Sequence, residues 1–124
     1  MEATQQQPLP EGKGVDVTEL LVERLDAGRT FYFEPQSTQA IHQAIQGCLI
    51  AIAKRRLNNR SDYVAIAKIK DDLQARSVMG KKKYGETLHT FNGRDANLDL
   101  YQELLDAYKY SGQQLEEESC SRSI

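Results

Sequence analysis

One segment, residues 40–57, constrains the fold more than any other part of the chain. Its apolar positions are three or four residues apart, at Ile41, Ala44, Ile45, Cys48, Leu49 and Ile52. That spacing places them on one face of an α-helix, where they are buried only if another element packs against them. Ser37 or Thr38 has the side chain to cap the first turn. The segment therefore predicts a long amphipathic helix that needs a partner.

Three further segments have apolar residues at helical spacing and no alternating, strand-like pattern. Their apolar residues are Leu20, Leu21 and Leu25; Val64, Ile66, Ile69 and Leu73; and Leu98, Leu105 and Tyr108. Amphipathic helices without strands favour an architecture in which apolar faces bury one another. The predicted fold is all-α, a helical bundle of about four helices.

Capping and stop residues give the expected bounds of the later helices. Ser61 or Asp62 is the expected cap of the third helix, and Gly80 is its expected end. The last helix is expected over about residues 95–114. Residues 29–36, RTFYFEPQ, indicate a short extended piece that packs over the domain.

Length and composition favour one domain with flexible ends. A chain of 124 residues suits a single core. Residues 1–14 are expected to form a flexible arm, residues 15–115 one α-helical domain and residues 116–124 a flexible tail.

The charge and hydropathy patterns exclude two classes of protein. The net charge of -2 argues against a chain that binds nucleic acid over its whole surface. No stretch approaches the roughly 18 apolar residues that span a bilayer, and the first residues lack the features of a secretory signal. The sequence therefore predicts a cytoplasmic protein with no membrane segment.

Four carboxylates follow one face of the last predicted helix. Asp95, Asp99, Glu103 and Asp106 are separated by four, four and three residues. Like charges at those spacings repel and destabilise a helix. Mg²⁺ would offset the repulsion, because it prefers carboxylate oxygens and keeps waters that substrate phosphates can replace. The alternative is a solvated acidic face in which Asp95 caps the helix.

A basic connection precedes this acidic helix. Residues 81–84 read KKKY, and Asn92 and Arg94 follow. Lys and Arg side chains neutralise phosphate oxygens, and an arginine does so with two parallel hydrogen bonds. The alternatives are a solvated turn or weak nucleic-acid patch for the lysines, and a structural pair between Arg94 and Asp95 or Asp99.

Residues 72–110, DLQARSVMGKKKYGETLHTFNGRDANLDLYQELLDAYKY, combine these features in one order. They resemble MazG-like members of the all-α nucleoside triphosphate pyrophosphohydrolases, especially the phage-type dATP/dGTP pyrophosphohydrolase group. In that group a helix with Arg and Gly near its end leads to a KYG turn, a Leu, NGRD and a helix with Asp, Glu and Asp. The matching residues are Arg76, Gly80, Lys83, Tyr84, Gly85, Leu88, Asn92, Gly93, Arg94, Asp95, Asp99, Glu103 and Asp106.

The resemblance implies Mg²⁺-dependent hydrolysis of a (deoxy)nucleoside triphosphate to the monophosphate and pyrophosphate, by a cytoplasmic homo-oligomer. The wider superfamily holds Mg²⁺ with E-x-x-E on one helix and E-x-x-D on the next. This chain has the second motif, but its preceding helix offers Asp71, Asp72 and Gln74 in place of the first. The implied metal ligands are Asp99, Glu103, Asp106 and Asp72, with Glu103 also as the catalytic residue. The implied substrate-binding residues are Lys83, Tyr84, Asn92 and Arg94.

Two other functions are compatible with the same residues. The absence of E-x-x-E motivates a catalytically weakened helical module that binds nucleotide or a protein partner. A small nucleic-acid-binding module would use KKKYG together with Arg55 and Arg56. Nucleic acid is the less favoured partner, since the net charge is negative and aromatic residues for base stacking are sparse.

Overall fold

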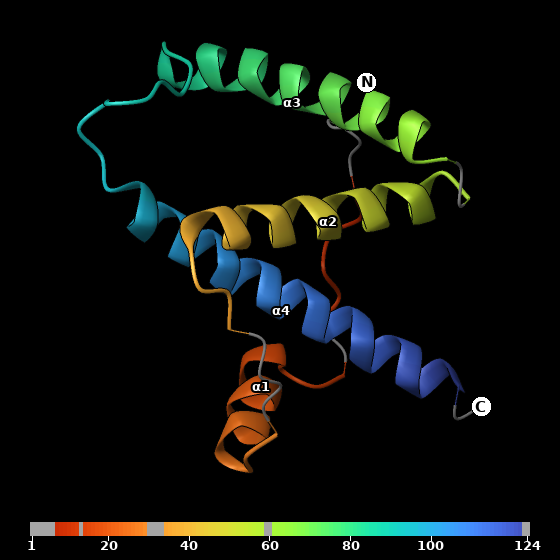
Figure 1. Ribbon diagram of the computed structural model, residues 1–124. Coiled ribbons are helices and arrows are strands. Elements are labelled where there is room, and N and C mark those ends of the chain that lie inside the picture. Colours follow the sequence, from red (N-terminus) through yellow and green to blue (C-terminus); the bar gives the residue numbers. More distant parts are fainter. Residues whose placement is uncertain (1–6, 13, 30–33, 59–60, 123–124) are drawn as a thin grey trace. The chain divides into compact units, whose positions relative to one another are not determined.

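The computed structural model describes residues 7–12, 14–29, 34–58 and 61–122. This part of the chain forms four α-helices and no strand (Figure 1): α1 Val17–Asp26, α2 Thr38–Arg56, α3 Asp62–Tyr84 and α4 Ala96–Arg122. The predicted all-α fold of about four helices is confirmed. Of the expected extended piece, residues 30–33 lie outside the described residues.

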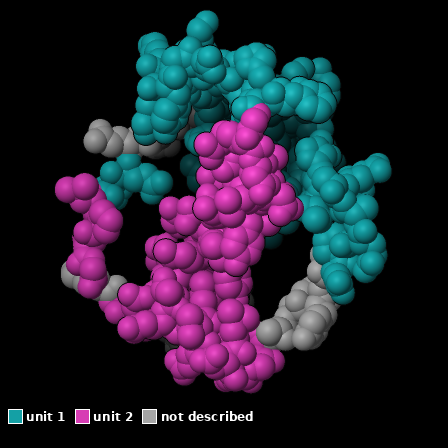
Figure 2. All heavy atoms as spheres, turned by 90° about the vertical axis from the view of Figure 1, so that its left-hand side faces the viewer, with its two compact units in different colours: residues 1–8, 33–92 teal, residues 9–32, 93–124 magenta. Residues whose placement is uncertain are grey.

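The four helices belong to two compact units, which are coloured teal and magenta in Figure 2. Unit 1 comprises residues 1–8 and 33–92, and unit 2 comprises residues 9–32 and 93–124. Within unit 1, α2 packs against α3, and within unit 2, α1 packs against α4. The single domain over residues 15–115 stays a prediction.

A side-chain cap begins each helix, as the capping rules predict. The four capping residues each accept a hydrogen bond at 3.1–3.3 Å from the backbone N–H three residues later; they are Asp16, Ser37, Ser61 and Asp95. Of the two candidates for α2 and for α3, the structure selects the first. Ser37 and Ser61 both have extended backbone conformations, which an N-cap requires.

The end of α3 differs from the expected end at Gly80. The helix continues through Tyr84 and stops at Gly85, whose φ of 82° is left-handed and whose N–H donates to the Lys81 carbonyl. A glycine inside a helix costs only about 1 kcal/mol, which neighbouring turns offset. The lysines before Gly85 also interact favourably with the negative end of the helix dipole. The three lysines, which were expected in a connecting loop, thus lie in the last turn of α3.

α4 extends beyond the expected end at Gln114 and reaches Arg122. The segment expected as a flexible tail is therefore helical as far as residue 122. Two side-chain hydrogen bonds at i,i+4 spacing support these last turns, from Gln113 to Glu117 and from Gln114 to Glu118. Such pairs stabilise a helix locally, without a tertiary core.

Unit 1 is held by a narrow contact between small side chains. Its buried residues are Ala53 on α2 and Ala65 and Ala75 on α3. Alanines let two helix axes approach closely, and an ion pair between Lys54 Nζ and Asp62 Oδ1, at 2.8 Å, joins α2 to the start of α3. The larger apolar side chains stay partly or mostly exposed, and none of the six residues of the predicted apolar face of α2 is buried.

Unit 2 is held by one leucine that packs against a glycine. Leu21 on α1 is only 6% exposed. A Cβ added to Gly112 on α4 would lie 2.8 Å from Leu21 Cδ2, so a larger residue there would force the Leu21 side chain to move. An ion pair between Arg24 Nη2 and Glu116 Oε2, at 2.6 Å, lies one turn further along both helices.

The substitution Gly47→Ala is expected to stabilise the protein by about 0.5–1 kcal/mol, because alanine has the higher helix propensity. Gly47 lies inside α2, and a Cβ there would meet nothing within 4 Å. The control, Gly85→Ala, is expected to destabilise it, since an L-residue at φ 82° is strained by roughly 1–2 kcal/mol. Urea unfolding followed by circular dichroism measures both. A loss of stability in Gly47→Ala would contradict the described environment of α2.

Candidate functional site

The last turns of α3 form a basic and aromatic surface. An open depression of about 490 Å³ is lined by Arg76, Met79, Gly80, Lys82, Lys83 and Tyr84. The Lys83 ammonium lies 5.2 Å from the centre of the Tyr84 ring, within the range of a cation–π contact. Lys83 and Tyr84, two of the predicted substrate-binding residues, therefore line the same depression, together with two further cations. This surface has the charge to bind phosphate groups.

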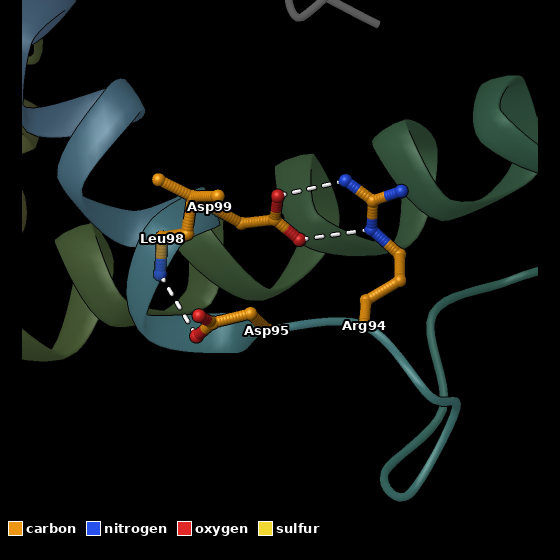
Figure 3. A network of polar contacts seen from close by, with 4 residues as sticks. All are labelled: Arg94, Asp95, Leu98 and Asp99. Atoms are coloured by element: carbon orange, nitrogen blue, oxygen red, sulfur yellow. Dashed lines mark hydrogen bonds and ion pairs between the residues drawn. The ribbon is translucent and has the colours of Figure 1, made fainter.

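Two of the four predicted carboxylates, Asp95 and Asp99, have hydrogen-bond partners at the start of α4 (Figure 3). Asp95 Oδ1 accepts the Leu98 N–H at 3.1 Å and so caps the helix. Asp99 accepts two hydrogen bonds from Arg94, from Nε to Oδ2 at 2.9 Å and from Nη2 to Oδ1 at 2.7 Å. Two of the four carboxylates therefore hold the start of α4.

The ion pair changes the protonation behaviour of both partners. The hydrogen bond from Arg94 lowers the pKa of Asp99, and the hydrogen bond to Asp99 raises the pKa of Arg94. Asp99 therefore stays ionised to lower pH than an ordinary carboxyl group, and its charge is already balanced by the protein. This geometry favours the structural alternative for Arg94 at the start of the helix.

Glu103 and Asp106 differ from the other two carboxylates. Both are exposed on α4, one helical turn apart, and neither has a hydrogen bond or ion pair with another residue in the described ranges. Like charges this close on one helix face repel. These two side chains are therefore available to an external cation.

The structure also tests how well the predicted ligands fit a metal ion. No group of three or more acidic, His or Cys side chains that could hold a metal occurs among the described residues. Asp72, on α3, accepts a hydrogen bond from Lys68 Nζ at 3.0 Å, and Asp99 is paired with Arg94. Two carboxylates remain, Glu103 and Asp106. They fit Mg²⁺, which proteins commonly bind through one or two carboxylates, with waters and substrate phosphates completing the octahedron.

The remaining predicted residue, Asn92, lies exposed in the connection between α3 and α4. Asn92 is the last residue of unit 1, whereas Arg94 and the α4 carboxylates belong to unit 2. The predicted substrate and metal residues are thus distributed over both units. In unit 1, Lys83 and Tyr84 lie together at the end of α3, and in unit 2, Glu103 and Asp106 lie one turn apart on α4.

Sequence reasoning missed a second depression on unit 1, between α2 and α3. It has a volume of about 250 Å³ and is lined by Leu49, Ile52, Ala53, Arg56, Lys68, Ile69, Asp72, Leu73 and Arg76. Its α3 residues recur every three or four positions, so the sequence does show that they share one helix face. The depression forms because α2 packs against α3, and that tertiary contact cannot be predicted from the sequence pattern.

No model of a known protein family matches this chain, and no curated protein or solved structure is significantly similar to it. The described residues contain no helix that is long and apolar enough to cross a membrane.

The substitution Arg94→Ala is expected to raise the pKa of Asp99 toward its usual value, because the hydrogen bonds that favour the ionised form are lost. In the wild type, ionised Asp99 stabilises the folded state above the unfolded-state pKa of about 3.9, and this contribution is lost as pH falls through the lowered native pKa. NMR titration of the Asp99 carboxyl carbon measures the shift. Arg24→Ala, which breaks the pair with Glu116, is the control and is expected to leave Asp99 unchanged. An unshifted Asp99 in Arg94→Ala would show that the pair does not form.

Proposed function

We propose that this chain hydrolyses a (deoxy)nucleoside triphosphate to the monophosphate and pyrophosphate in a Mg²⁺-dependent reaction in the cytoplasm. One observation carries the proposal: Glu103 and Asp106 are exposed, lie one turn apart on α4 and have no cation of the protein beside them in the described ranges. Its second support is the order KYG, NGRD and E-x-x-D, which resembles that of MazG-like pyrophosphohydrolases.

The residues are proposed to divide the work as follows. Glu103 and Asp106 would hold Mg²⁺, which polarises a phosphate and lowers the pKa of a bound water. Arg76, Lys82 and Lys83 would contact phosphate oxygens and stabilise the charge that develops on them. Asp72 is left out of the metal site, because Lys68 already balances its charge.

The proposed substrate and metal residues come from both units. Cations at the end of α3 belong to unit 1, and the carboxylates of α4 belong to unit 2. Asn92 and Arg94 lie in the connection between α3 and α4, and we propose that both bind substrate. A homo-oligomer is part of the proposal, because large apolar side chains such as Tyr101 and Tyr110 are 60% and 70% exposed.

The test is a product analysis. Purified protein is incubated with each of the four dNTPs and Mg²⁺, and pyrophosphate, inorganic phosphate and nucleotides are quantified. Pyrophosphate and the monophosphate are expected in equal amounts, and a chelator is expected to stop their release. Release of inorganic phosphate and a diphosphate, or no product with any dNTP, would contradict the proposal.

A second candidate, a helical module that binds nucleotide without turnover, is favoured by one observation. Asp72 and Asp99 are each paired with a basic side chain, so only two of the four predicted ligands lack a protein cation. The same assay separates the two candidates when it is combined with calorimetry. Nucleotide binding with no product would establish the module and exclude the enzyme.

A further inference from the structure

The depression between α2 and α3 combines apolar walls with a polar margin. Leu49 and Ile52 from α2 and Ile69 and Leu73 from α3 form its walls, and Ala53, which is buried, lies at the contact between the helices. We call this depression the α2–α3 slot. Its volume of about 250 Å³ is below the roughly 300–1,000 Å³ of a pocket for a drug-sized molecule. It therefore has room for one part of a ligand, such as a single ring system.

The polar margin of the slot offers a donor beside an acceptor. Lys68 Nζ lies 3.0 Å from Asp72 Oδ2, and their side chains are only 17% and 33% exposed. Hydrogen bonds that are partly shielded from water are stronger than fully solvated ones. A ligand edge with both N–H groups and oxygen or nitrogen acceptors would match this pair, and nucleobase edges have that composition.

The slot adjoins the basic depression, because Arg76 lines both. Both belong to unit 1, and Arg76 precedes Lys83 by two helical turns on α3, about 10 Å along the axis. Beyond Arg76 the lining consists of Met79, Gly80, Lys82, Lys83 and Tyr84. The two depressions therefore meet at Arg76, and the large aliphatic walls belong to the slot.

We propose that the α2–α3 slot holds the base of the nucleoside triphosphate, with its phosphate chain on the basic depression. The inference rests on the proposed function for the triphosphate and adds the place where the base is bound. Leucine and isoleucine walls contact the faces of the base, Lys68 and Asp72 contact its edge, and Arg76 meets the first phosphate where the two depressions join.

The charges of this surface distinguish a nucleotide from an apolar partner. The two depressions have five cationic lining residues, Arg56, Lys68, Arg76, Lys82 and Lys83, and one carboxylate, Asp72. An apolar helix of another protein, or of a second copy, would cover Leu49, Ile52 and Leu73 but would leave the surplus of cations unbalanced. A ligand with a flat apolar part and a polyanionic part satisfies both ends.

The experiment compares a nucleotide with its phosphate chain alone. Calorimetry measures the affinities of α,β-methylene dNTP analogues and of inorganic tripolyphosphate, at fixed Mg²⁺, for the wild type, Leu73→Gln and Val78→Gln. The wild type is expected to bind at least one dNTP analogue about tenfold or more tightly than tripolyphosphate. Leu73→Gln is expected to remove that difference and to keep the tripolyphosphate affinity. Val78, on α3 and 55% exposed, lines neither depression, so Val78→Gln is expected to behave as the wild type.

The other outcomes each contradict a specific part of the proposal. If the wild type binds the analogues and tripolyphosphate equally well, the base does not bind in the slot, although the phosphate site remains supported. If the wild type binds neither ligand, the proposed function itself is wrong. Light scattering is measured in parallel: if Leu73→Gln lowers the molar mass together with both affinities, the slot is an interface between copies and not a base site.

A second variant, Asp72→Asn, keeps the shape of the slot. It is expected to lower the affinity for the analogues and to leave the affinity for tripolyphosphate unchanged. An unchanged affinity for the analogues would exclude Asp72 from base recognition.

Discussion

Replacing Glu103 by glutamine is expected to lower kcat for dNTP hydrolysis on the order of 10²–10³-fold, the effect typical of losing one group that stabilises developing charge. Glu103 is exposed on α4 and has no partner among the described residues, so the change removes no packing. It also relieves repulsion along the acidic face, and we expect the melting temperature without metal to stay level or rise slightly. Steady-state pyrophosphate release and thermal unfolding measure the two effects.

The matched control for this prediction is Glu117→Gln. Glu117 is another exposed carboxylate of α4, and its Oε2 accepts a hydrogen bond from Gln113. We expect this variant to keep the wild-type kcat. A Glu103→Gln protein that retains most of its turnover would exclude Glu103 as a ligand or catalytic group and would favour the solvated acidic face.

Mg²⁺ with a non-hydrolysable dNTP analogue is expected to stabilise the wild type by about 2.7 kcal/mol at a hundredfold excess over Kd, since both ligands bind only the folded state. Asp106→Asn is expected to remove the part of this response that depends on Mg²⁺. Asp99→Asn is expected to keep most of it, because Asp99 is neutralised by Arg94 and contributes less to the metal. Differential scanning calorimetry with and without Mg²⁺ measures the response.

The two aspartate variants serve as controls for each other. Both remove one carboxylate charge from the same helix, so a general electrostatic effect would change both responses equally. The reverse order, with Asp99→Asn losing the Mg²⁺ response and Asp106→Asn keeping it, would show that the Arg94–Asp99 pair opens to bind metal. A wild-type melting temperature that ignores Mg²⁺, even with the analogue present, would reject the metal site.

Local rules predicted the helices well, because caps and apolar spacing act within a few residues. Ser37, Ser61 and Asp95 each cap the helix that the sequence places after them. The helix ends were harder to predict, since a glycine inside a helix costs little and the result depends on the turns that follow. α3 therefore passes Gly80 and stops where Gly85 adopts a left-handed conformation.

The spacing of apolar residues could not predict which distant segments contact each other. Nothing in the periodicity of α1 pairs Leu21 with Gly112, because their close approach arises only when the two helices touch. The α2–α3 slot depends in the same way on the packing of α2 against α3. The sequence left two roles open for Arg94, phosphate binding and a structural ion pair. Its two hydrogen bonds to Asp99 show the structural role at the start of α4.

The position of the lysines at the end of α3 has a consequence for how the protein would respond to its surroundings. Anions bound at the start of a helix are held by backbone N–H groups, whereas the end of a helix carries partial negative charge and repels them. A phosphate at Lys82 and Lys83 would thus depend on side-chain cations and not on backbone N–H groups. Attraction between exposed charges is screened over about 8 Å at physiological ionic strength. Nucleotide occupancy should therefore fall steeply as salt is added, so the ionic composition of the cell would set how often this surface is filled.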